Sequence, residues 1–179
     1  GEFVASFKPT AKRTYYVYLT DKNYNVLDKA EIEVQSVEPE LSLKSFEATV
    51  SEITETYEGE CYRLLNNRAL TATATIANSP DATPLQSTIR MELMKYDEAV
   101  GDMVLEKNIT VSGLNFYPGE TTRVETTVED LEVGGYYALC MKDKLSGVEN
   151  DETLSMEGVD TLIRFKVCGP TLESVSVVG

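Results

Sequence analysis

The acidic side chains gathered in one connection are the residues with the most obvious chemical potential. Between residues 143 and 160 the chain carries six acids against one lysine. Carboxylate oxygens suit calcium, although no EF-hand spacing is present. A long acidic loop also suits a glycan or host-protein partner, or is simply solvated. The candidate ligand-binding residues are therefore Asp143, Glu149, Asp151, Glu152 and Asp160.

A second acidic cluster has no basic residue among its members. It consists of Glu52, Glu55, Glu58 and Glu60. We expect it at the opposite end of the molecule from the 143–160 connection, so the two clusters should not form one site. A solvated face is the simplest interpretation of it.

Composition excludes several function classes. The chain of 179 residues contains no histidine, which excludes Ser-His-Asp and Cys-His catalysis and histidine metal ligands. Its net charge of −14 argues against nucleic-acid binding. No apolar run approaches the length of a membrane span, so no membrane insertion is expected. No carboxylate pair stands out, and we expect neither an enzyme nor a resident cofactor or metal, with calcium the one candidate ion.

Most of the sequence outside these acidic segments shows the alternation of β-strands. Thr71–Ile76, Ile89–Leu93 and Leu162–Val167 alternate apolar and polar residues, as half-buried strands do. Turn residues separate them, for example Pro118-Gly119. The predicted strands are 40–50, 68–77, 86–96, 103–111, 121–130, 135–142 and 161–168. This spacing predicts an all-β, immunoglobulin-like (fibronectin type III-like) antiparallel β-sandwich.

An internal repeat suggests the domain organisation. Arg13–Leu19 is similar to Gly134–Cys140, and Ala30–Val34 to Ile163–Val167, in the same order. We therefore expect 1–37 to be the last strands of a truncated sandwich, 38–169 a complete sandwich, and 170–179 the first strand of a following repeat. The chain would be a slice of a tandem array. Exposed edges in 1–37 could then pair two copies of this fragment into a dimer.

A corner motif and a cysteine pair follow from this fold. Leu131, a glycine-rich corner and Tyr136 fit a tyrosine corner, in which the phenol bonds upstream backbone; Tyr15 is the counterpart of Tyr136. Three cysteines allow at most one internal disulfide. The last strand of such a sandwich runs beside the first, so Cys61 and Cys168 are the candidate pair, and Cys140 is a core residue.

Three motifs resemble bacterial CARDB-type adhesion domains: Ala72–Ser79, Phe116–Thr122 and Leu131–Tyr137. The tandem layout is similar to that of cell-surface proteins of the Bacteroidetes. The resemblance implies an extracellular or cell-surface location and a non-catalytic role as a spacer or adhesion module, whose partners are neighbouring domains and a glycan or host protein. The alternative is an accessory domain that positions the catalytic domain of a secreted enzyme, such as a peptidase.

Overall fold

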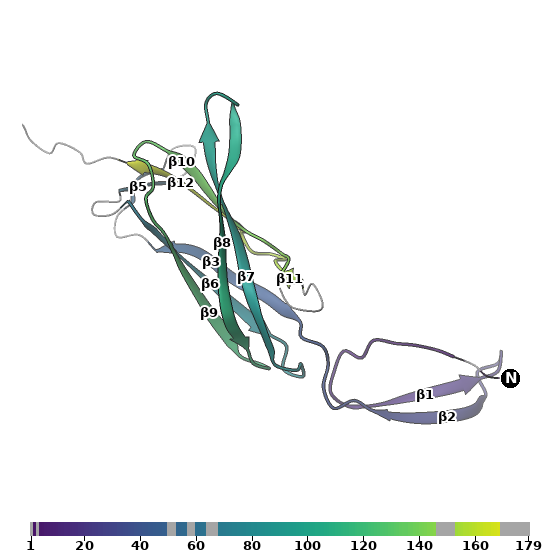
Figure 1. The fold of residues 1–179 in the computed structure, drawn as a ribbon. Helices are drawn as coiled ribbons and strands as arrows, with labels where there is room; N and C mark the ends of the chain where they lie inside the picture. Colours follow the sequence, from purple (N-terminus) through teal and green to yellow (C-terminus); the bar gives the residue numbers. More distant parts are fainter. Residues whose placement is uncertain are drawn as a thin grey trace, which may run out of the picture.

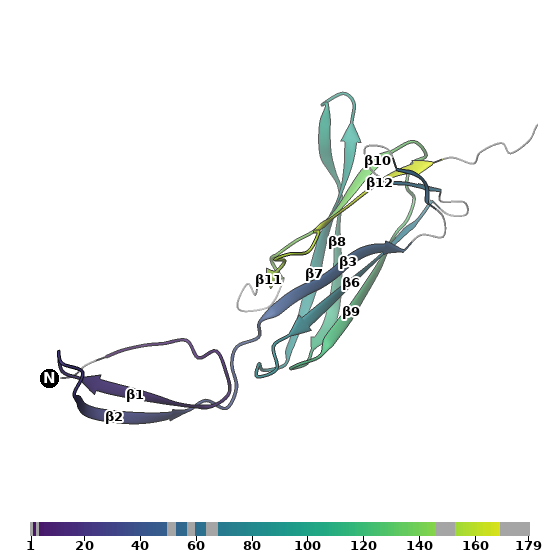
Figure 2. The same ribbon diagram turned by 180° about the vertical axis from the view of Figure 1, so that it is seen from behind.

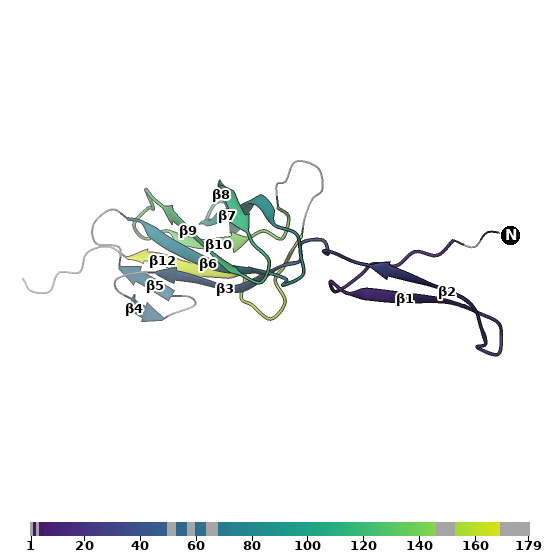
Figure 3. The same cartoon turned by 90° about the horizontal axis from the view of Figure 1, so that it is seen from below.

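The protein is a β-sandwich joined to a separate two-stranded hairpin. The computed structural model describes residues 2, 4–49, 53–56, 60–63, 68–145 and 153–168, without the side chains at 53–56, 60, 61 and 63. Figures 1 and 3 show the hairpin extending from one end of the sandwich. Within the described part of the chain no helix is long and apolar enough to cross a membrane.

Two sheets form the sandwich (Figures 1 and 2). One has the strand order β11-β3-β6-β9 and the other β4-β5-β12-β10-β7-β8. The four-stranded sheet comprises β11 (Leu154–Ser155), β3 (Leu41–Thr49), β6 (Leu70–Asn78) and β9 (Thr121–Val128). The six-stranded sheet comprises β4 (Ile53–Thr56), β5 (Glu60–Arg63), β12 (Leu162–Cys168), β10 (Tyr136–Met141), β7 (Leu85–Asp97) and β8 (Asp102–Phe116).

The prediction of an all-β sandwich is confirmed, and each of the seven predicted strands overlaps an observed one. Short strands β4, β5 and β11 were not predicted. Two pairings also depart from the antiparallel expectation, because β11 runs parallel to β3 and β5 runs parallel to β12. The domain bounds themselves stay a prediction, and residues 169–179 lie outside the described residues.

The core lies between the sheets and follows from period-two alternation. In β6, Leu70, Ala72, Ala74 and Ile76 are fully buried, while the intervening threonines are only half-buried. Thr71 meets Thr127 of β9 directly across the strands, with 3.0 Å between their hydroxyl oxygens. Alternation thus gives β6 one face for the core and one for cross-strand hydroxyl pairs.

A second hairpin, β7–β8, runs past the end of the sandwich as an arm (Figure 1). At its tip the Gly101 amide donates to the Asp97 carbonyl over 2.8 Å. Gly101 has φ +74°, which favours glycine over residues with a side chain. The arm therefore ends in a tight turn and leaves Tyr96 and Val100 exposed.

The separate hairpin consists of β1 (Thr14–Thr20) and β2 (Val26–Glu33). Its link to the sandwich is hydrogen-bonded. The Val37 amide donates to the Asp81 carbonyl over 2.8 Å, and the Thr83 amide donates to the Val37 carbonyl over 2.9 Å. The Lys12 amide donates to Asp81 Oδ2 over 3.1 Å. The turn around Asp81 thus contacts both ends of the 12–37 segment.

The β1–β2 hairpin repeats the pairing of β10 with β12. Tyr15 is opposite Ile32, as Tyr137 is opposite Phe165. Beyond the strands, the Val34 amide donates to the Arg13 carbonyl over 3.1 Å, and the Val167 amide to the Gly135 carbonyl over 3.0 Å. The two hairpins therefore correspond residue by residue, with Arg13 equivalent to Gly135 and Val34 to Val167.

This correspondence corrects the predicted corner by one residue. The Glu132 amide donates to the Tyr137 hydroxyl over 2.9 Å, five residues along the chain, and Tyr137 is buried. The role assigned to Tyr136 belongs to Tyr137 because Tyr137 lies on the core face with Leu139 and Met141. Leu131 is buried as expected. Tyr15 makes the equivalent bond, from the Thr10 amide over 3.2 Å, so Tyr15 corresponds to Tyr137.

Candidate functional site

The predicted acidic connection lies only partly within the described residues. Asp143 and Asp160 are exposed, and Asp160 Oδ1 accepts a hydrogen bond from the Leu162 amide over 3.1 Å. Glu149, Asp151 and Glu152 lie outside the described residues. No group of three or more acidic or cysteine side chains among the described residues is placed to hold a metal ion. Binding by this set stays a prediction.

The same connection carries buried apolar residues that sequence reasoning missed. Leu145 and Leu154 are each 1% exposed and belong to the core. Leu154 also pairs with Leu41, so β11 forms the edge of the four-stranded sheet. The Leu154 amide donates to the Asp143 carbonyl over 2.7 Å, which fixes the return of the chain. The two leucines in an otherwise acidic segment were the available signal.

The second acidic cluster lies outside the described side chains, so its solvated face stays a prediction. Its side chains, at Glu52, Glu55, Glu58 and Glu60, all lie outside the described ones. Their backbone region includes β4 and β5, at the edge of the six-stranded sheet beside β12.

Two of the three cysteines have described side chains, and they differ in bonding state. Cys168 is disulfide-bonded and Cys140 is free. The Cys61 side chain lies outside the described ones, so its pairing with Cys168 stays a prediction. The backbone register agrees with the predicted proximity, because Cys61 is opposite Lys166 and Arg63 is opposite Cys168. The prediction that Cys140 is a core residue is wrong: it is half-buried, because alternation with Leu139 and Met141 turns it to the other face of β10. This partial burial still raises the pKa of the Cys140 thiol, which disfavours its reactive thiolate.

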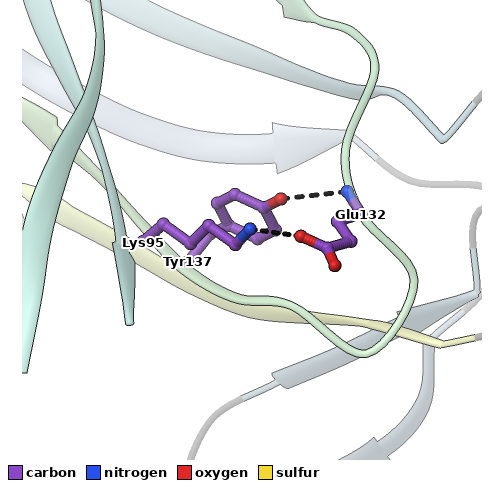
Figure 4. A network of polar contacts seen from close by, with 3 residues as sticks. All are labelled: Lys95, Glu132 and Tyr137. Atoms are coloured by element: carbon purple, nitrogen blue, oxygen red, sulfur yellow. Dashed lines mark hydrogen bonds and ion pairs between the residues drawn. The ribbon is translucent and has the colours of Figure 1, made fainter. Parts of the chain in front are cut away.

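A network of three residues stands at the corner between β9 and β10 (Figure 4). Lys95 of β7 forms an ion pair with Glu132. The Lys95 ammonium lies 5.9 Å from the centre of the Tyr137 ring. The Tyr137 hydroxyl accepts a hydrogen bond from the Glu132 amide. The hydrogen bond that the Lys95 ammonium donates to the Glu132 carboxylate raises the pKa of Lys95 and lowers that of Glu132, so both side chains are charged at neutral pH. The network joins β7 to the corner and leaves neither charge ready for acid–base chemistry.

An open groove of about 930 Å³ adjoins this network. The arm and the corner form its walls, with four carboxylates and two lysines along them. Its lining includes Lys95, Tyr96, Glu106, Glu132, Tyr136 and Lys166. Sequence reasoning missed it because the arm and the corner are separated in the chain, and the corner motif indicated a structural role with no neighbouring arm. The groove offers aromatic and carboxylate groups to a partner but no nucleophile with an adjacent base.

Comparisons with known proteins give no family. No family model and no curated protein matches the chain. Among solved structures, a β-glucosidase from Kluyveromyces marxianus aligns with 13% identity and a TM-score of 0.34. That alignment covers 72% of this chain and 15% of the β-glucosidase.

Proposed function

We propose that this chain is a non-catalytic immunoglobulin-like part of a tandem array in a secreted or surface protein, where it acts as a rigid spacer. The strand order supports the immunoglobulin-like assignment. One sheet contains the order β3-β6-β9 and the other β12-β10-β7-β8. These orders match A-B-E and G-F-C-C′ of an immunoglobulin-like sandwich, which supports the assignment.

One observation carries the proposal of an array: the β1–β2 hairpin repeats the β10–β12 strand pair of the sandwich, both in strand register and in the corner hydrogen bond. Thr10–Tyr15 and Glu132–Tyr137 are bonded in the same way across five residues. A two-stranded hairpin is marginal by itself. Its presence is therefore best explained as the end of a preceding repeat.

Rigidity is supported by the junction. The Asp81 carbonyl accepts a hydrogen bond from the Val37 amide, and the Asp81 side chain accepts one from the Lys12 amide. One bond holds the segment before β1 and the other holds the segment after β2. Together they restrain the hairpin from rotating against the sandwich as well as from moving away from it. Lys8 and Glu38 add an ion pair of 3.5 Å, which contributes little because both side chains are exposed.

An extracellular location is supported by the disulfide at Cys168, because disulfides persist chiefly in oxidising compartments. An interaction role beside the spacer role is supported by the groove, which presents exposed Tyr96 and the carboxylates of the arm to solvent.

The experiment is a measurement of residual dipolar couplings in the hairpin and in the sandwich. A rigid spacer requires one alignment tensor for both parts. Asp81→Ala should give the hairpin smaller, averaged couplings, because it removes the acceptor of the Lys12 amide. Asp28→Ala is the matched control, since among the described residues the Asp28 side chain accepts a hydrogen bond only from the amide of its neighbour Lys29. Averaged hairpin couplings in the unsubstituted chain would contradict the proposal.

A further inference from the structure

One face of the β1–β2 hairpin, called the Val17 face below, is apolar except for Asp28 opposite Leu19, and most of it is uncovered. Tyr15, Val17 and Leu19 alternate onto it from β1, and Ile32 lies opposite Tyr15. Val17, Leu19 and Ile32 are 39%, 41% and 39% exposed. Within the described part of the chain the sheet has only these two strands. The Phe7 ring packs against Tyr15 with 5.3 Å between ring centres. No strand of the described residues covers the rest of the face or pairs with either edge.

The equivalent face of β10–β12 is completely covered. Leu139 and Met141 correspond to Val17 and Leu19, and Phe165 corresponds to Ile32. Their exposed fractions are 0%, 4% and 0%. The difference between the two hairpins thus lies in what packs on them.

The sandwich shows what covers such a face. The buried residues of β10 and β12 share one core with those of β3 and β6 in the opposite sheet. At the edges, β7 adds to β10 antiparallel and β5 adds to β12 parallel. An equivalent complement for β1–β2 is a sheet patterned like β3–β6, with one strand at each edge.

We infer that the Val17 face binds a sheet patterned like β3–β6, supplied by a preceding repeat of the same polypeptide, so that the hairpin completes that repeat. This inference rests on the proposed array. A second copy of this chain is the poorer occupant, because its own β10–β12 hairpin already covers its β3–β6 face. Two hairpins packed face to face would also leave all strand edges unpaired.

A chimera built from the chain itself tests this inference. In this chimera residues 38–133 come first and are followed directly by residues 12–179, with Lys12 in the place of Gly134. Residues 38–133 and 12–37 then form a first sandwich, and residues 38–179 follow as an unaltered second one. The β1–β2 amides should exchange with solvent on the order of a hundredfold more slowly than in the chain of 179 residues, because opening them would require unfolding a sandwich. The unaltered second sandwich is the internal reference.

Two substitutions locate the effect on the face. In the chimera Val17→Asp should restore fast exchange, because it places a charge in the new core. Tyr18→Asp is the matched control: Tyr18 is next along the strand, points to the other face and is 53% exposed, so exchange should stay slow. Equal effects of the two substitutions would overturn the assignment of the face.

A second chimera separates misfolding from a wrong inference. It also replaces residues 21–25 by residues 143–158, which supplies the equivalent of β11. Fast β1–β2 exchange in both chimeras would overturn the inference. So would slow exchange in the unaltered chain together with a dimer in sedimentation that Val17→Asp dissociates, because a second copy would then be the occupant. Either of these two results could occur even if dipolar couplings give the hairpin and the sandwich one alignment tensor. The rigid spacer and the occupant of the Val17 face are therefore tested separately.

Discussion

The β1–β2 and β10–β12 hairpins share strand register and a corner hydrogen bond but differ in burial. Phe165 is fully buried, whereas its equivalent Ile32 is 39% exposed. Pairing is thus set within each hairpin by alternation and by its corner, while burial depends on a second sheet. The difference indicates that a strand pair of this kind is a component of a sandwich and becomes stable only when that sandwich is complete.

The largest expected difference between the hairpins is at the core position. Phe165 stacks on Tyr137 with 5.4 Å between ring centres and meets Tyr62 edge-on at 5.9 Å. Phe165→Ala should lower the free energy of unfolding by about 3–5 kcal/mol because it leaves a cavity. Ile32→Ala should change it by less than about 0.5 kcal/mol, as exposed substitutions do. Urea unfolding measures both, and similar losses would contradict the comparison.

A smaller effect is expected at the corner glycine. A Cβ at Gly135 would lie 2.6 Å from the Tyr137 ring and 3.0 Å from the Glu132 carbonyl. Gly135→Ala should therefore destabilise the sandwich by about 1–3 kcal/mol through overpacking. The equivalent Arg13 already carries a side chain, whose guanidinium lies 4.8 Å from the centre of the Tyr15 ring.

The control is Arg13→Ala, which should leave sandwich unfolding unchanged. A neutral Gly135→Ala, measured by thermal or urea unfolding, would show that the corner has more room than its geometry indicates.

Removing the corner hydroxyl should have a more modest effect. Tyr137→Phe keeps the ring but leaves the partly buried Glu132 amide without its acceptor. We expect a loss of about 1 kcal/mol. Tyr15→Phe removes the corresponding bonds in the uncovered hairpin and should not alter sandwich unfolding. Chemical denaturation of both variants is the measurement; an equal loss in the two would show that the hairpin and the sandwich unfold as one unit.

The smallest effect is spectroscopic. Hydrogen bonds, foremost that with the Thr10 side chain, lower the pKa of Tyr15 to about 8. A lowered pKa in the folded protein means that the ionised phenol favours the corner. This contribution is complete above the ordinary tyrosine pKa near 10 and is lost as the pH falls through about 8.

Absorbance of tyrosinate should therefore show an early step near pH 8 that Tyr15→Phe abolishes. Thr10→Val should move that step to higher pH. A single titration near the ordinary value in the unsubstituted chain would contradict the corner described for Tyr15.

The strands were predictable because each long strand repeats its pattern several times. β11 was not, since two residues carry no period, although Leu145 and Leu154 marked the segment as partly buried. Exchanging 143–160 for a tight turn would therefore remove core residues as well as acids. Alternation with Leu139 and Met141 could have selected Tyr137 over Tyr136.

The contacts between distant segments were beyond the sequence. Lys12 and Asp81 are separated by 69 positions, and Lys95 and Glu132 by 37. No local pattern requires either contact, because charged residues at exposed positions have many alternative partners. The junction and the groove therefore emerge only from the folded chain.

The most direct test of the central claim is amide hydrogen exchange of the 179-residue chain, read strand by strand. We expect β10 and β12 to exchange only when the whole sandwich unfolds. β1 and β2 should exchange much faster, by local opening, despite their identical register. Equal protection of the two hairpins in a monomeric chain would contradict this expectation, because β1–β2 would then be stable without the sheet of another repeat.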